Sequence, residues 1–167
     1  KIWGYSFNKS NLNFDESLKQ LDEKINQATK IRLMSDVPLG IFLSGGIDSS
    51  LVAYYAQKNS KQKIKTFSIG FKEKSFDESN YARQVAKYLG TDHHERILSA
   101  KDSLEFIPQI ADLLDEPMAD PSIVPTYLLS KFTKQNVTVA LGGDGGDELF
   151  MGYDTFVAQH YADIYDK

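Results

Sequence analysis

The period of apolar and polar positions changes several times along the chain, and each change predicts a new element. Apolar residues spaced three and four apart predict an amphipathic helix over about residues 15–34. The apolar run 38–43 predicts a short buried strand, and a second helix is predicted from about Ser49. The β-branched and aromatic run 64–71 predicts a second strand. The first half of the chain therefore reads as helix, strand, helix, strand.

The second half of the chain continues this alternation. Ser75 and Glu78 have the spacing of a capping box and predict the start of a helix, and Gly90 predicts its end. The remaining predicted elements are a weaker strand at 94–98, a helix at 102–114 that is interrupted or kinked at Pro108, a helix at 122–134 and a strand at 137–141.

Strands that alternate with helices predict an α/β fold, namely a Rossmann-like parallel sheet with helices on both faces. A chain of 167 residues with 41% hydrophobic residues can bury one such core, which favours a single domain. In sheets of this kind, ligands bind beyond the carboxyl ends of the strands. The loops that follow the predicted strands are therefore the places to look for chemistry.

Composition excludes several classes of function. The net charge is −4 and no basic block is present, so nucleic-acid phosphates and membrane surfaces are not expected partners. There is no cysteine, which excludes disulfides, thiolate metal sites and a cysteine nucleophile. The first residues do not show the charged and apolar regions of a signal peptide, and no apolar stretch is long enough to span a bilayer. A cytoplasmic protein is the natural expectation.

The first glycine-rich loop, residues 44–50, reads Ser-Gly-Gly-Ile-Asp-Ser-Ser and lies between a predicted strand and a predicted helix. Glycines allow close backbone approach, and a helix N-terminus with nearby serine hydroxyls offers hydrogen-bond donors to a phosphate or pyrophosphate. The loop lacks the lysine of the Walker motif and the three spaced glycines of the dinucleotide fingerprint. Asp48 predicts a magnesium ion between its carboxylate and the phosphates. The alternative is a plain turn in which Ser and Asp cap the helix.

The second glycine-rich loop, residues 141–150, reads Leu-Gly-Gly-Asp-Gly-Gly-Asp-Glu-Leu-Phe and also follows a predicted strand. Its carboxylates suggest a metal and acceptor site that faces the first loop. The alternative is that Asp147 and Glu148 only cap the following helix, since acidic residues favour helix N-termini.

These motifs carry a resemblance to a known family. Ser-Gly-Gly-x-Asp-Ser resembles the pyrophosphate loop (PP-loop) of the AMP-forming ATP pyrophosphatases. With the second loop and several further segments, nearly the whole chain resembles the synthetase domain of glutamine-dependent asparagine synthetase. These segments are 37–50, 66–71, 76–83, 90–95, 115–117 and 125–127.

The resemblance implies an adenine-nucleotide alpha-hydrolase-like fold over residues 15–167, with residues 1–14 as the linker from a missing glutaminase domain. It implies ATP as a substrate, aspartate and ammonia as the other substrates, Mg²⁺, and a homodimer of the full-length protein. The implied reaction adenylates the aspartate side chain and transfers ammonia, giving asparagine, AMP and pyrophosphate.

The resemblance also assigns roles to individual residues. The ATP-binding residues would be Phe42, Leu43, Ser44, Gly45, Gly46, Asp48, Ser49, Ile69 and Gly143. The metal ligands would be Asp48 and Asp147, and the catalytic residues would be Asp144, Asp147 and Glu148.

Two departures from the family pattern keep other readings open. The family commonly has Glu where this chain has Asp144, and a later Lys that contacts the phosphates in the family is absent. The acceptor could therefore be that of a β-lactam or lasso-peptide cyclase or a sugar amidotransferase, and an ATP-binding fragment that is inactive by truncation is a further alternative. Relatives that modify tRNA or form NAD or GMP share only the first loop.

Two further sets of residues carry structural expectations. His93 and His94 are adjacent in a predicted strand, so they should point to opposite sides and not share a metal. Tyr153, Phe156, Tyr161 and Tyr165 follow the second loop at helical spacing and are expected to pack against a part of the domain that is missing here.

Overall fold

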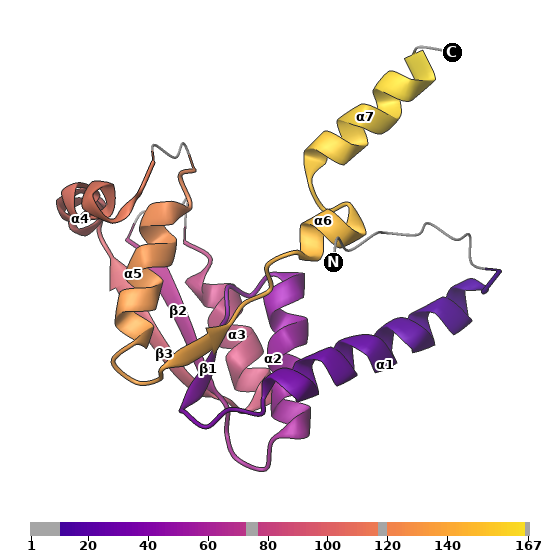
Figure 1. The fold of residues 1–167 in the computed structure, drawn as a ribbon, viewed down its shortest axis with the longest axis horizontal. Coiled ribbons are helices and arrows are strands. Elements are labelled where there is room, and N and C mark those ends of the chain that lie inside the picture. Colours follow the sequence, from indigo (N-terminus) through magenta and orange to yellow (C-terminus); the bar gives the residue numbers. More distant parts are fainter. Residues whose placement is uncertain (1–10, 73–76, 117–119, 166–167) are drawn as a thin grey trace.

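The computed structural model describes residues 11–72, 77–116 and 120–165 and contains a four-stranded parallel sheet in the order β3-β2-β1-β4 (Figure 1). The strands are β1 (Leu39–Phe42), β2 (Lys65–Phe71), β3 (Asp92–Leu98) and β4 (Val139–Leu141). The helices are α1 (Phe14–Arg32), α2 (Ile47–Asn59), α3 (Ser79–Leu89), α4 (Ala100–Leu113), α5 (Ile123–Thr133), α6 (Gly146–Phe150) and α7 (Asp154–Tyr165). The predicted parallel α/β sheet is confirmed.

Both faces of the sheet are covered by helices, as predicted. Ile41 of β1 and Leu43, just after it, are buried against alanines of α2 and α3, whose small side chains let these helices lie close to the sheet. Phe67 of β2 points to the other face, where its ring lies 6.0 Å from that of Phe132 in α5. Since neighbouring residues of a strand alternate between faces, β1 and β2 divide their side chains between the two helical layers.

β1 pairs with two neighbours, one of which is near to it in the chain and the other far from it. β1 pairs with β2 in the register Gly40–Lys65, and with β4 in the register Leu39–Val139. The chain passes from β1 through β2 to β3 on one side and then returns to the other side of β1. This reversal lies between β1 and β4, and such points are where α/β sheets bind ligands.

The start of α3 differs from the prediction. Ser75 lies outside the described residues, and the helix begins at Ser79. The carboxylate of Asp77 accepts hydrogen bonds from the backbone N–H groups of Ser79, at 3.1 Å, and Phe71, at 3.3 Å. Asp77 therefore joins the end of β2 to the start of α3. Gly90, with φ of +71°, ends the helix as predicted.

Two other boundaries also differ. α4 continues through Pro108, so the predicted interruption is wrong, while the alternative of a kink stays a prediction. A proline leaves unpaired the carbonyl one turn earlier, at Leu104, and this residue is exposed on α4, so water can reach that carbonyl. β4 begins at Val139 rather than at residue 137, because its partner β1 begins only at Leu39.

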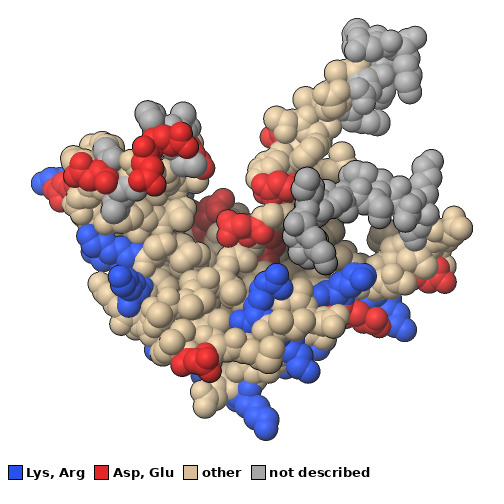
Figure 2. All heavy atoms as spheres, in the orientation of Figure 1, with Lys and Arg blue, Asp and Glu red and all other residues tan. Residues whose placement is uncertain are grey.

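α6 and α7 extend beyond the body that contains the sheet (Figure 1). The space-filling view in Figure 2 shows a hollow beside them. On the face in Figure 2, acidic side chains gather around this hollow, while the basic side chains lie away from it. No helix among the described residues is both long enough and apolar enough to cross a membrane.

Candidate active site

A cavity of about 900 Å³ lies where the two glycine-rich loops meet, beyond the carboxyl ends of β1 and β4. Its walls come from both loops, the end of β2, and the helices α1, α2 and α5. Of the residues assigned to the site from the sequence, those that line it are Phe42, Leu43, Ser44, Gly46, Asp48, Ser49, Ile69, Gly143, Asp144, Asp147 and Glu148. Gly45 is the one assigned residue that does not.

The first loop is held by its own serines. The hydroxyls of Ser44 and Ser49 lie 2.9 Å apart, and Ser49 also accepts a hydrogen bond from the backbone N–H of Ser44 at 3.2 Å. Gly46 is the N-cap of α2, and no side chain caps this helix. The first N–H groups of α2 therefore remain available at the cavity, and they favour an anion there.

Gly45 has a packing role. Its φ is +90°, and a Cβ atom there would lie 2.5 Å from the backbone nitrogen of Ala82 and 2.6 Å from the carbonyl carbon of Tyr81. The loop therefore lies directly on α3 at this glycine. Gly45 supports the shape of the loop from behind instead of lining the cavity.

The second loop packs on the first through glycines. A Cβ atom at Gly143 would lie 2.7 Å from the backbone nitrogen of Ser49 and 3.0 Å from the carbonyl carbon of Asp48. A Cβ atom at Gly146 would lie 2.4 Å from the carboxylate carbon of Asp48. A side chain at Gly143 would meet backbone and push the two loops apart, whereas one at Gly146 would meet the carboxylate of Asp48 and displace it.

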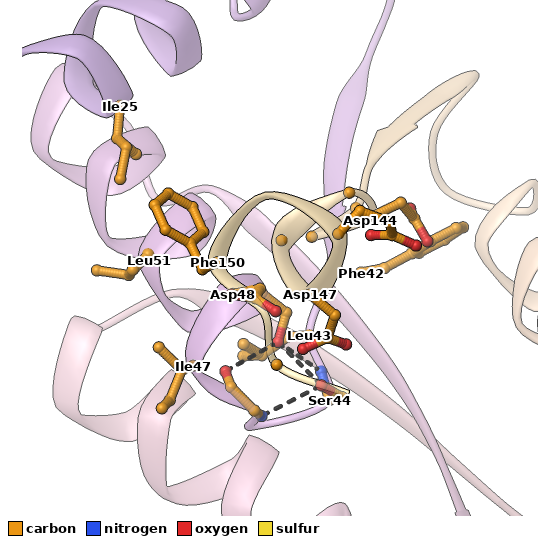
Figure 3. A pocket seen from close by; sticks show the side chains of 18 of the residues that line it. Ile25, Phe42, Leu43, Ser44, Ile47, Asp48, Leu51, Asp144, Asp147 and Phe150 are labelled. Atoms are coloured by element: carbon orange, nitrogen blue, oxygen red, sulfur yellow. Dashed lines mark hydrogen bonds between the residues drawn. The ribbon is translucent and has the colours of Figure 1, made fainter. Parts of the chain in front are cut away.

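Four carboxylates line the cavity, which has no Lys, Arg or His among its described lining residues. In Figure 3, Asp48 and Asp147 lie near Ser44, whereas Asp144 lies toward the side of Phe42. The carboxylate of Asp144 turns back over Gly142, where a Cβ atom would lie 2.3 Å from its Oδ2. A polyphosphate could enter such a negative cavity only together with a cation.

The donor set suits magnesium. No group of three or more metal-binding side chains occurs within the described ranges. Asp48 and Asp147 nevertheless line the same cavity, and Mg²⁺ is commonly held by one or two carboxylates together with substrate phosphates. The residues present therefore fit a magnesium ion that arrives with a nucleotide.

Tyr153 is a site residue that the sequence did not reveal. It precedes α7, lines the cavity, and donates a hydrogen bond of 2.7 Å from its hydroxyl to Oε1 of Glu148. This bond lowers the pKa of the Glu148 carboxyl and raises the pKa of the Tyr153 hydroxyl. The helical spacing suggested only packing, and the Glu-x₄-Tyr separation across the end of α6 is the signal that could have identified the pair.

The other unforeseen lining residues come from helices and from the end of β2. They are Leu21, Ile25, Ile47, Leu51, Ser68, Thr126, Leu129 and Phe150. Most are apolar, and an apolar residue at helical spacing has the same pattern whether it faces a core or a ligand cavity. Ser68 and Thr126 are the polar members of this set.

The two adjacent histidines point to opposite faces, as predicted. The ring of His94 stacks on that of Phe67 with centroids 5.1 Å apart, whereas Nδ1 of His93 lies 2.9 Å from the hydroxyl of Thr66. Neither lines the cavity.

Comparison with known sequences gives a family match and several relatives. The asparagine synthase family matches residues 20–165. The chain is 39% identical over 142 residues to glutamine-hydrolysing asparagine synthetase 1 of Bacillus subtilis. This alignment covers 85% of this chain and 22% of that protein. The chain is 44% identical over 141 residues to a putative glutamine-hydrolysing asparagine synthetase 2 of Methanocaldococcus jannaschii, covering 84% of this chain and 27% of that protein. The chain thus spans about a quarter of the length of these curated relatives.

Comparison with solved structures supports the fold. The NH₃-dependent NAD synthetase of Campylobacter jejuni aligns with a TM-score of 0.53 at 17% identity, covering 81% of this chain and 60% of that one. The NMN synthetase of Francisella tularensis aligns with a TM-score of 0.54 at 18% identity, covering 81% and 58%. At this level of identity the likeness concerns the fold alone.

Proposed function

Since the chain belongs to the asparagine synthase family, we propose that it is the ATP-binding part of an AMP-forming amide ligase that makes asparagine. In the first step, an oxygen of the aspartate side-chain carboxylate attacks the α-phosphorus of ATP, and the bond to pyrophosphate breaks. In the second step, ammonia attacks the acyl carbon of the adenylate, the bond to AMP breaks, and the nitrogen loses a proton. The relatives named glutamine-hydrolysing suggest glutamine as the ammonia source.

The single observation that carries this proposal is the convergence of both glycine-rich loops on one cavity at the reversal between β1 and β4. The N–H groups at the start of α2 would bind the pyrophosphate end of ATP, with the hydroxyls of Ser44 and Ser49 beside them. Phe42, Leu43 and Ile69 would flank the adenine. This arrangement supplies placement and charge neutralisation, and it requires no nucleophilic side chain.

The carboxylates would divide the remaining roles. Asp48 and Asp147 would hold magnesium, which neutralises phosphate charge and assists the departure of pyrophosphate. Gly143, which lies against the start of α2, would let backbone approach the adenylate closely. Asp144 and Glu148 would orient the adenylate and the incoming ammonia, and Tyr153 would hold Glu148 in place.

One observation favours a second candidate with the same adenylation step but another acceptor, as in β-lactam and lasso-peptide cyclases and sugar amidotransferases. The carboxylate of Asp144 turns back over Gly142, where a Cβ atom would clash with it, so this arrangement depends on glycine at 142. The side chain of Asp144 is also shorter than that of Glu by one C–C bond, about 1.5 Å. A different acceptor would account for both changes together.

The test is ATP–pyrophosphate exchange by the longest natural polypeptide that contains these 167 residues. We expect exchange that requires magnesium and aspartate and that is lost in Asp48→Asn, a substitution of nearly equal size. Lys61→Gln, in the loop after α2 and outside the cavity, is the matched control and should exchange normally. Exchange that does not depend on aspartate would refute the asparagine assignment, and binding of ATP without any exchange would support the inactive alternative.

A further inference from the structure

A chain of side-chain hydrogen bonds connects the cavity wall to α3 behind β2. The hydroxyl of Ser68 lies 3.3 Å from Nε2 of His93, and Nδ1 of the same ring lies 2.9 Å from the hydroxyl of Thr66. Thr66 lies 2.9 Å from the hydroxyl of Thr91, which donates to the backbone carbonyl of Ala86 at 3.5 Å. Thr66 and Ser68 are buried, and Ser68 lines the cavity beside Ile69.

The carbonyl at the α3 end allows one consistent direction for the bonds in this chain. A carbonyl oxygen can only accept, so in this arrangement the hydrogen of the Thr91 hydroxyl points to Ala86, at 3.5 Å. Thr91 then accepts from Thr66. Thr66 in turn accepts from Nδ1 of His93, which in this arrangement carries a hydrogen.

The state of His93 then determines the state of Ser68. A neutral imidazole with hydrogen on Nδ1 has a free lone pair on Nε2, so Nε2 accepts the hydroxyl hydrogen of Ser68. That leaves Ser68 with oxygen lone pairs and no hydrogen to offer. On the wall of a cavity, such a hydroxyl is an acceptor of fixed polarity.

The surroundings of His93 favour its neutral form. Burial lowers the pKa of His93 from the ordinary 6.5, the neighbouring Glu95 opposes this, and His94 and Arg83 lower it further. Glu95 is itself paired with Arg83 at 2.8 Å, and its Oε2 lies 3.9 Å from Nε2 of His93. A lowered pKa keeps the imidazole mainly neutral at pH 7.

We propose that the Ser68 hydroxyl oxygen accepts a hydrogen bond from the nucleoside part of the bound nucleotide, and that His93 is the positioning residue that fixes its polarity. The inference rests on the proposed function for the presence of a nucleotide. Ser68 adjoins Ile69, which would flank the adenine, so the candidate donors are the 6-amino group of the base and the ribose hydroxyls. All of these are hydrogen-bond donors, and an experiment with nucleotide analogues distinguishes them.

The first arm of the test measures the tautomer of His93 without any nucleotide. In protein labelled with ¹⁵N-histidine, the ring nitrogen shifts should show hydrogen on Nδ1 of His93 at pH 7.5, with the signal assigned by its loss in His93→Gln. Hydrogen on Nε2 instead would reverse the polarity of Ser68 and overturn the inference, whatever the protein binds.

The second arm measures the dissociation constant of MgATP by calorimetry. Ser68→Ala removes one hydrogen bond and should weaken binding about fivefold. His93→Phe should weaken MgATP binding to a similar degree. The double variant should bind little more weakly than Ser68→Ala alone, because both substitutions act through the hydroxyl oxygen of Ser68. His93→Gln should restore most of the affinity, since its amide oxygen can accept from Ser68. His94→Phe, on the opposite face of β3, is the matched control and should bind normally.

Analogues identify the donor. One of 2′-deoxy-ATP, 3′-deoxy-ATP and inosine triphosphate should bind the wild type and Ser68→Ala equally, because it lacks the partner of Ser68. As the pH falls through the lowered pKa of His93, the protonated ring donates to Ser68, so MgATP should bind the wild type more weakly, with no such change in Ser68→Ala. Equal MgATP affinity in the wild type and Ser68→Ala would overturn the inference alone. Failure of the wild type to bind MgATP would overturn both this inference and the proposed function.

Discussion

Gly143→Ala is the substitution that most directly tests the contact between the two loops. The added Cβ would lie 2.7 Å from the backbone nitrogen of Ser49, and ordinary contact begins near 3.4 Å, so the loops must separate by roughly 0.7 Å. Overpacking of this kind typically costs about 1–3 kcal/mol of stability. Because a displacement near 1 Å can cost about 100-fold in activity, we expect MgATP affinity to fall at least about tenfold.

The same loop offers a matched control in Gly145→Ala. Gly145 also lines the cavity and has a φ of +90°, but a Cβ atom there would meet nothing within 4 Å. Alanine in this left-handed conformation costs about 1–2 kcal/mol, which is similar to the loss expected for Gly143→Ala. The two variants should therefore be similarly destabilised, while only Gly143→Ala separates the loops.

The assay combines urea unfolding, which gives the loss of stability, with calorimetric titration of MgATP. The reasoning predicts a similar loss of stability in both variants and a loss of affinity in Gly143→Ala alone. If Gly143→Ala stays folded and binds MgATP within twofold of the wild type, or if Gly145→Ala loses as much affinity, the close contact of the loops does not determine binding.

Three further predictions concern single contacts. Tyr153→Phe removes the hydrogen bond that lowers the pKa of Glu148, so the acid limb of the pH–rate profile should move to higher pH; an unchanged limb would show that Glu148 does not control the rate. Burial of Tyr55, together with the hydrogen bond that its hydroxyl donates to a carboxylate of α1, raises the pKa of Tyr55 from 10.0 to about 12. The folded state therefore favours the neutral phenol. The stability gained from this is present below pH 10 and is lost as the pH rises to 12. Urea unfolding should show that loss in the wild type and not in Tyr55→Phe. Gly40→Ala would place a Cβ atom 2.5 Å from the ring of Phe67 and should destabilise the sheet by about 1–3 kcal/mol, measured by thermal unfolding, without the selective loss of MgATP binding expected at the loops.

The sequence predicted the sheet and the place of the site because both depend on local patterns. Buried strands followed by glycines and helix starts are visible as runs of a few residues, and the parallel order of the strands places their carboxyl ends at one edge. The residues of both loops that were assigned to the site therefore line one cavity, apart from Gly45, whose contact with α3 depends on how the helices pack.

What the sequence could not give are contacts between elements. The hydrogen bond between Tyr153 and Glu148 arises because α6 ends after only one turn, and no spacing in the sequence specifies where that helix ends. The role of Ser68 depends on His93 and on the register of β2 and β3, which no local pattern specifies. The start of α3 was misplaced because Asp77 is held by the end of β2, a contact from outside the helix.

The pairing of Leu39 with Val139 also has a consequence for folding. β1, β2 and β3 are consecutive in the chain, so they can assemble before β4 has been synthesised, and such an intermediate would carry the first loop without the second. Closing the long segment between β1 and β4 costs entropy, so that pairing is expected to form late. A nucleotide that contacts both loops would bind only after this last step, and by mass action it would then hold the completed sheet together.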